Sequence, residues 1–184
     1  GSHAVGMQVL RQAAQGRYPK PCIAEMGGKN ATIVSRHADV ERAALGILRS
    51  AFGLSGQKCS ACSRVYVERP VATALRERLV QLTREIAVGD PTRQANWMGP
   101  VIDRRAYDRY ARLADHLRRV GSVDTGGEWL TGGDLARGFF VAPTVARAPL
   151  DDAAWVDEHF LPVVLVGEVD SVDEGIDRAN ASDY

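Results

Sequence analysis

The chain has 184 residues, 45% hydrophobic and 25% charged, a composition typical of a soluble globular protein with one sizeable core. Its 23 basic and 23 acidic residues balance, so no net charge attracts nucleic acid or an anionic membrane, and we expect neither as a partner. No apolar run approaches the roughly 18 residues of a membrane span, and no signal segment is recognisable, so we expect a cytoplasmic protein. Three cysteines argue against a disulfide framework.

The first elements in chain order are a helix and two strands. Residues 2–16 predict a short helix, with Ser2 as the N-cap and Gly16 as the stop. A strand, entered through a proline-rich turn, is predicted for "YPKPCIAEM". After Gly27 and Gly28, the run "ATIV" predicts a second, buried strand.

The middle of the chain predicts helix, strand and helix around a cysteine-containing loop. Apolar residues at steps of three and four predict a helix from Ala38 to about Ser50, with Asp39 near its start. It leads into the loop "LSGQKCSACSR". A strand is predicted for "SRVYVERP", with Pro70 just past its end. Leucine and isoleucine at steps of four, three and four then predict a helix from about Val71 to Val88.

The last part of the chain repeats the alternation of helices and strands. A loop, "GDPTRQANWMGP", precedes an amphipathic helix, "DRRAYDRYARLADHLRRVG", that ends at Gly121. Two strands are predicted for "FFVAPTV" and "LPVVLVGEV", and a closing helix for "SVDEGIDRAN". Strands that alternate with helices in this way predict an α/β fold with a largely parallel sheet flanked by helices.

Cys59 and Cys62 lie three apart in the central loop and allow several interpretations. A zinc site needs four ligands, and this chain offers one such pair, Cys22 and four scattered histidines. A thioredoxin-like dithiol precedes a helix, whereas this pair follows one. Two buried core thiols remain an alternative, since free cysteine is often buried. The polar residues around Cys59 instead favour an exposed loop, where a neighbouring lysine could stabilise a reactive thiolate.

A nucleophilic cysteine needs a base to release its covalent intermediate. None of the four histidines lies in a segment typical of a site. Glu25 is the better candidate, because it ends a predicted strand and precedes two glycines that allow close approach to the backbone. A structural ion pair between Glu25 and Lys29 is the alternative.

The segments "AEMGGKN" and "GQKC", with Cys59 34 positions after Glu25, resemble the two signature segments of the aldehyde dehydrogenase superfamily. Further similar segments are "VGDP", "MGPVID", "GFFVAPTV", "DEHFLPV" and "NASDY", so the resemblance covers essentially the whole chain. Within the superfamily, "GQKCSACSR" and "GPVID" are most similar to the glutamate-semialdehyde (1-pyrroline-5-carboxylate) dehydrogenases of proline catabolism.

The resemblance implies that Cys59 is the nucleophile, that its backbone N–H forms half of an oxyanion hole, and that Glu25 is the general base. It implies NAD as the cofactor, without excluding NADP. The residues expected to contact the cofactor are Ser2, Val5, Met26, Gly27, Glu158 and Phe160. Ser60 is expected to help hold the substrate carboxylate. Leu161 stands where the family usually has glycine.

The resemblance also implies how the chain is divided. We expect residues 1–25 to be the tail end of a dinucleotide-binding domain and residues 26–184 to be a catalytic domain that is incomplete at its C-terminus. Residues 1–3 equally fit a remnant of an affinity tag. We therefore expect a fragment that self-associates and turns over slowly or not at all, from a parent that is a homo-oligomer.

Other functions remain open. A CoA-acylating semialdehyde dehydrogenase would use CoA, not water, to resolve the thioester. A non-catalytic interaction module could retain the fold without the cofactor half. A cysteine hydrolase would need a histidine near Cys59, which the sequence does not predict.

Overall fold

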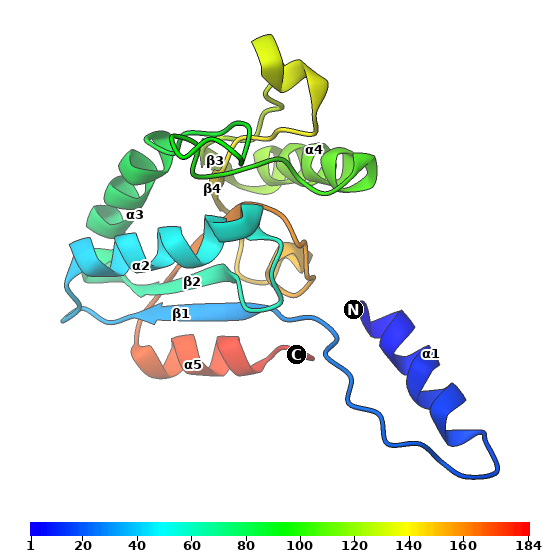
Figure 1. Ribbon diagram of the computed structural model, residues 1–184. Helices are drawn as coiled ribbons and strands as arrows, with labels where there is room; N and C mark the ends of the chain where they lie inside the picture. The colour runs from blue at the N-terminus through cyan, green and yellow to red at the C-terminus, as the bar shows by residue number, and fades with distance from the viewer.

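The computed structural model describes residues 1–184, and its centre is a five-stranded sheet in the order β1-β2-β5-β4-β3 (Figure 1). Four strands run parallel: β1 (Asn30–Val34), β2 (Cys62–Glu68), β5 (Val163–Val169) and β4 (Thr144–Arg147). The edge strand β3 (Ser122–Thr125) is antiparallel to β4. The predicted α/β fold with a largely parallel sheet flanked by helices is confirmed.

Helices cover both faces of the sheet. On one face, α2 (Val40–Phe52) and α3 (Arg69–Arg84) enclose a core cluster of 16 buried residues. On the other face, α4 (Arg104–Val120) and α5 (Val172–Asn180) pack over a second cluster of 15. Three short 3-10 turns, at Gly53–Gly56, Gly133–Arg137 and Ala153–Trp155, complete the regular structure. The sheet is thus buried on both sides, as parallel strands require.

Side-chain caps define where several helices begin. The hydroxyl of Ser2 accepts a hydrogen bond from the N–H of Val5 and caps α1 (His3–Ala14), as predicted. The carboxylate of Asp39 caps α2 in the same way. Pro70 lies just past the end of β2, as predicted, and in the first turn of α3, where a proline loses no intrahelical hydrogen bond. The helix predicted from about Val71 to Val88 runs from Arg69 to Arg84 in the structure, so it starts and ends earlier.

The strand predicted for residues 18–26 does not form. Residues 15–29 contain no regular element, and the Ile23 side chain is 94% exposed. Pro19 and Pro21 have no N–H to donate, and none of the strands pairs with this segment. Together with α1, it forms an N-terminal arm (residues 1–29) that extends away from the layered body (Figure 1).

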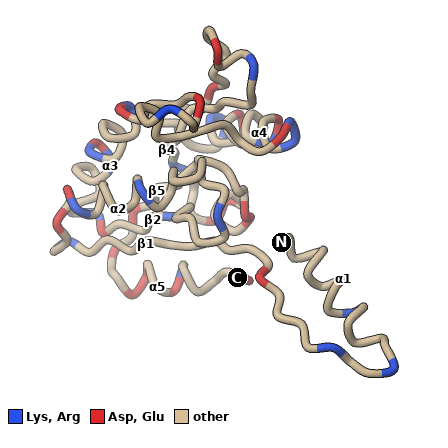
Figure 2. The backbone as a smooth tube through the Cα atoms, in the orientation of Figure 1, with Lys and Arg blue, Asp and Glu red and all other residues tan.

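The surface carries basic and acidic side chains interspersed over α2, α3 and α4 (Figure 2). None of the helices combines the length and the apolar character needed to cross a lipid bilayer.

Candidate active site

Cys59 is presented by a sharp turn between α2 and β2. Leu54 and Ser55 adopt left-handed backbone conformations, with φ of 53° and 56°, so helix α2 cannot continue. The Ser55 hydroxyl donates to the Gly99 carbonyl oxygen at 2.9 Å, and the Gln57 side-chain oxygen accepts from the Ile102 N–H at 2.8 Å. These bonds fasten the cysteine turn (residues 54–61) to the "MGPVID" segment.

The two cysteines of the loop lie in different environments. Cys59 is exposed, and its carbonyl oxygen accepts from the Asn30 side-chain amide at 2.5 Å. Cys62 is only 4% exposed at the start of β2, with its sulfur 3.2 Å from the Thr32 hydroxyl. Burial raises the pKa of the Cys62 thiol, which disfavours its thiolate. Only Cys59 is available for chemistry, and the interpretation of Cys62 as a packed core residue is confirmed.

The segment from Glu25 to Asn30 passes beside the cysteine turn. Gly28 has no room for a side chain, since a Cβ there would lie 2.3 Å from the Cys59 carbonyl oxygen. The Gly28 N–H donates to Glu158 Oε1 at 3.0 Å. Gly27 has a φ of 117°, and a Cβ there would lie 2.8 Å from Glu158 Oε2. The two glycines therefore let this backbone fit between Cys59 and Glu158.

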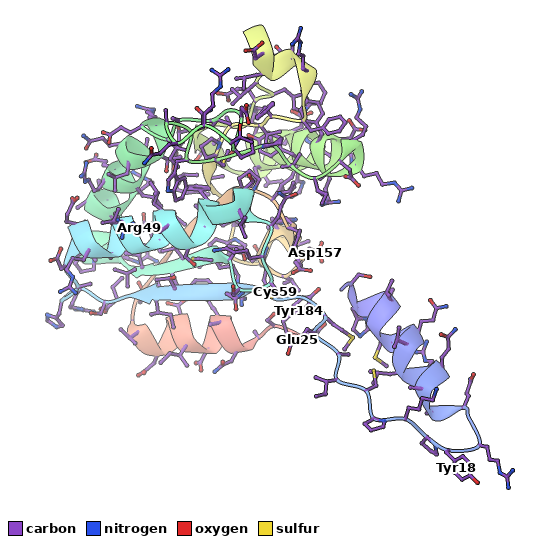
Figure 3. All side chains as sticks on the ribbon, in the orientation of Figure 1. Tyr18, Glu25, Arg49, Cys59, Asp157 and Tyr184 are labelled. Atoms are coloured by element: carbon purple, nitrogen blue, oxygen red, sulfur yellow. The ribbon has the colours of Figure 1, made fainter.

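Glu25 is exposed and does not end a strand, so the prediction that it closes a strand was wrong. Its carbonyl oxygen accepts a hydrogen bond from the Gly1 amino group at 2.7 Å, which brings the start of α1 against it. No ion pair joins Glu25 to Lys29, whose side chain is buried beneath the segment. Figure 3 shows Glu25 and Cys59 in the region between the layered body and α1.

A cavity of about 790 Å³ gathers most of the expected site residues. It is lined by seven of them, namely Ser2, Glu25, Gly27, Cys59, Ser60, Glu158 and Phe160, together with Gly1, Gln57, Lys58, Arg109 and His159. Two expected cofactor residues lie outside it: Val5 is exposed on α1, and Met26 packs against Gly6 of the same helix. The cavity thus has the exposed Cys59 thiol and two carboxylates, Glu25 and Glu158, on its wall.

Phe160 and Leu161 shape the loop that carries Glu158. Phe160 has a φ of 55°, a left-handed conformation that is uncommon outside glycine. Leu161 is buried, and its carbonyl oxygen would lie 2.3 Å from a Cβ at Gly56. The glycine of the cysteine turn therefore packs directly on the backbone of this loop.

Sequence reasoning missed Arg109 and His159. Arg109 projects from α4 and donates from Nε to the His159 carbonyl oxygen at 3.0 Å. His159 Nε2 lies 3.1 Å from the Ala154 carbonyl oxygen, and burial lowers the pKa of the ring to about 3. The ring is therefore neutral near pH 7. Arg109 belongs to no motif that marks it, and it lines the cavity only because α4 packs beside the loop of His159. His159 stands in "DEHFLPV", between two expected site residues, and that position was the signal that could have identified it.

The structure contains no group of three His, Cys, Asp or Glu side chains placed to hold a metal ion. The side chains that line the cavity include a thiol, two carboxylates and the cationic groups of Lys58 and Arg109.

The chain belongs to the aldehyde dehydrogenase family, whose model matches residues 1–184. It is 43% identical over 190 residues to the 1-pyrroline-5-carboxylate dehydrogenase of Geobacillus kaustophilus, a match that covers 100% of this chain and 36% of that protein. The chain thus spans about a third of the length of the curated relatives it matches.

Solved structures are similar over the same length. A 1-pyrroline-5-carboxylate dehydrogenase from Thermus with bound NAD superimposes with a TM-score of 0.91 at 31% identity, over 100% of this chain and 36% of that one. Proline utilization A from Bdellovibrio bacteriovorus gives a TM-score of 0.91 at 38% identity, over 100% of this chain and 19% of that one.

Proposed function

We propose that these residues form the thiol-bearing part of an NAD(P)-dependent aldehyde dehydrogenase that oxidises L-glutamate 5-semialdehyde to glutamate. The observation that carries the proposal is that Cys59, Glu25 and Glu158 line one cavity, although they come from three separate segments of the chain. Membership of the aldehyde dehydrogenase family supports the reaction class. Relatives named 1-pyrroline-5-carboxylate dehydrogenase support the substrate.

The first step uses Cys59. Its thiolate adds to the aldehyde carbonyl carbon, and the carbonyl oxygen becomes an alkoxide in a thiohemiacetal. The backbone N–H of Cys59 would donate a hydrogen bond to that oxygen and stabilise the developing charge. Fixed bonds from Asn30, Ser55 and Gln57 hold the turn before substrate arrives, so the N–H need not be reoriented.

The cavity fits a nicotinamide cofactor beside the thiol. Glu158 Oε1 is held by the Gly28 N–H, so Oε2 is available for the hydroxyls of a ribose. Phe160 offers a flat surface for the ring, and the start of α1, at Ser2, suits a phosphate group. A nicotinamide held there would supply the hydride acceptor, and loss of hydride from the thiohemiacetal carbon would leave a thioester on Cys59.

Glu25 completes the cycle. Its carboxylate takes a proton from a water molecule as the water oxygen attacks the thioester carbonyl, and the C–S bond then breaks to release the carboxylate product and the Cys59 thiolate. Glu25 is exposed to the cavity and unpaired, so it can accept that proton. Ser60 lines the same cavity, which supports a contact with the substrate carboxylate.

We also infer that residues 1–25 end a dinucleotide-binding domain and that residues 26–184 belong to the catalytic domain. No residue of α1 is buried, as expected of a helix whose apolar side chains pack against residues outside these 184.

A cysteine hydrolase is less well supported, although His159 does line the same cavity as Cys59. A general base works best with a pKa near the working pH, and burial lowers the pKa of His159 to about 3. A CoA-acylating enzyme would not need Glu25 as a base. CoA-dependent release of product would favour that alternative.

The experiment measures NADH formation from glutamate semialdehyde by the full-length gene product and by the 184-residue chain. In the full-length protein, Cys59→Ala should lower kcat by about 1,000-fold or more. Cys62→Ala is the matched control and should change kcat by less than about threefold. Retained turnover in the Cys59→Ala variant would overturn the proposal.

A further inference from the structure

Arg64, near the start of β2, is a buried cation that no carboxylate pairs with. The residue is only 4% exposed, and none of the ion pairs in the structure includes it. Its Nε has no hydrogen-bond partner. A guanidinium does not lose its proton in a protein, so its burial without a carboxylate is unfavourable. A residue kept at this position despite that cost calls for a role beyond packing.

Two backbone carbonyl oxygens take the place of a carboxylate. Arg64 Nη2 donates to the carbonyl oxygen of Lys29 and, at 3.3 Å, to that of Ala179. Ala179 lies in the last turn of α5, where carbonyl oxygens lack partners within the helix and carry partial negative charge. The guanidinium also lies over the Tyr66 ring, 5.9 Å from its centre. Arg64 thus joins the segment before β1 to the end of α5.

The ladder between β1 and β2 is irregular at the same place. The register shifts between Asn30 and Ala31, so that Ser63 has no partner on β1. Such a bulge is rare between parallel strands, interrupts the hydrogen bonds of the ladder and re-aims the side chains beside it. The Lys29 carbonyl oxygen stands directly before this shift, and the Arg64 side chain bonds to it there.

The residues on either side of this carbonyl group contact two parts of the cavity wall. The Gly28 N–H donates to Glu158 Oε1 at 3.0 Å. The Asn30 side-chain amide donates to the Cys59 carbonyl oxygen at 2.5 Å. The Lys29 carbonyl group and the Asn30 nitrogen belong to one planar peptide unit, so a rotation of that unit would turn the chain on both sides of it.

We propose that Arg64 is a positioning residue: its bond to the Lys29 carbonyl oxygen fixes the chain segment that holds both the cysteine turn and the Glu158 carboxylate. Arg64 does not line the cavity and acts only through this segment. The inference rests on the proposed function in one respect, that Cys59 attacks the substrate and Glu158 holds the cofactor. Both kcat and the KM for NAD therefore depend on Arg64, since a small displacement of reacting groups slows a reaction strongly.

The kinetic experiment uses the full-length gene product. Arg64→Met replaces the guanidinium with an unbranched apolar side chain, and it should lower kcat about 10- to 100-fold and raise the KM for NAD about fivefold. Arg64→Lys keeps the charge but lacks the planar group of donors, so it should recover part of the loss. Arg78→Met, which removes an arginine of α3 paired with Glu41, is the matched control and should leave both constants unchanged.

A destabilised variant separates positioning from loss of stability. Leu79→Ala removes buried packing on α3, away from the cavity, so it should lower the unfolding temperature. At a temperature where the variants remain folded, its kcat and KM for NAD should stay within about threefold of the wild-type values. Wild-type constants in Arg64→Met, or an equal loss of activity in Leu79→Ala, would overturn the inference.

Amide hydrogen exchange provides a second measurement that needs no activity, and Arg64→Lys serves it because this variant keeps the buried charge. Exchange over residues 27–31 should be about tenfold faster than in the wild type, because the bond from the Gly28 N–H to Glu158 opens more often. Exchange over α3 should be unchanged. Wild-type exchange over residues 27–31 would overturn the inference even if the dehydrogenase activity is found. Faster exchange there in a protein without activity would support the inference and overturn only the proposed function.

Discussion

The N-terminal arm and the layered body hold their parts of the active site in different ways. In the body, Cys59 lies on a turn that three hydrogen bonds hold: Asn30 bonds to Cys59 itself, and Ser55 and Gln57 bond to the "MGPVID" segment. In the arm, α1 has no buried residue, and Glu25 follows a stretch without regular structure. The Cys59 thiol is thus preorganised by the body itself, whereas the position of the Glu25 carboxylate depends on what contacts the arm.

The largest expected effect tests how differently the two regions contribute to stability. Leu79 on α3 is fully buried, and Leu79→Ala should lower the free energy of unfolding by about 2–5 kcal/mol through loss of packing. Val9 on α1 is 47% exposed, so Val9→Ala should change it by less than about 0.5 kcal/mol. Urea unfolding of the 184-residue chain measures both values. Similar losses for the two variants would mean that the arm packs as firmly as the body.

An intermediate effect is expected where the arm meets the body. Gly27→Ala places a side chain at a φ of 117° and against Glu158, so it should cost about 1–3 kcal/mol in stability and weaken cofactor binding. Gly46→Ala, on α2, has open space around its Cβ and should be neutral or stabilising. Thermal unfolding and the KM for NAD of the full-length gene product provide the readouts. Equal unfolding temperatures and equal KM values for the two variants would show that Gly27 and Glu158 do not constrain each other.

The effect that is smallest near neutral pH concerns the loop of the body that carries Glu158. The pKa of His159 is about 3 in the folded chain because of burial, so the unfolded state binds more protons between about pH 3 and 6.5. Stability is therefore complete above about pH 6.5 and falls with decreasing pH, by at most about 1.4 kcal/mol per pH unit from this group. His159→Gln keeps a donor for the Ala154 carbonyl oxygen and should flatten this dependence.

His37→Gln is the control for that prediction, because His37 is exposed and lies far along the chain from the loop. Unfolding free energies across the acid range compare the two variants. If the unfolding free energy of His159→Gln falls with decreasing pH as steeply as that of the wild type, the body does not hold the His159 ring neutral.

Local patterns were sufficient to predict most of the body. Apolar spacing along α2, α3 and α4 identified the helices, and Asp39 marked the start of one of them. Strand β3 was not predicted, since four half-buried residues at a sheet edge give no apolar run. The "YPKPCIAEM" segment gave the opposite error. It has the composition of a strand, but a strand forms only where another strand pairs with it. Local composition does not show whether such a strand is present.

Some residues of the candidate site can likewise be identified from motifs, whereas others are identified only from the fold. Cys59 and Glu25 stand in short segments that can be recognised by their letters and separation. Arg109 and Lys29 gain their places from contacts between elements far apart in the chain. No neighbouring residue in the sequence marks a lysine as buried, so its environment could be known only from the structure.

The measurement that tests the account most directly follows a single turnover of Glu25→Gln in the full-length gene product. With glutamate semialdehyde and NAD, we expect a burst of NADH close to one per active site, followed by slow turnover, with the acyl mass retained on Cys59 in a peptide map. That result requires Cys59 to form the thioester and Glu25 to hydrolyse it. Steady turnover at the wild-type rate, or an acyl group on another residue, would contradict the account.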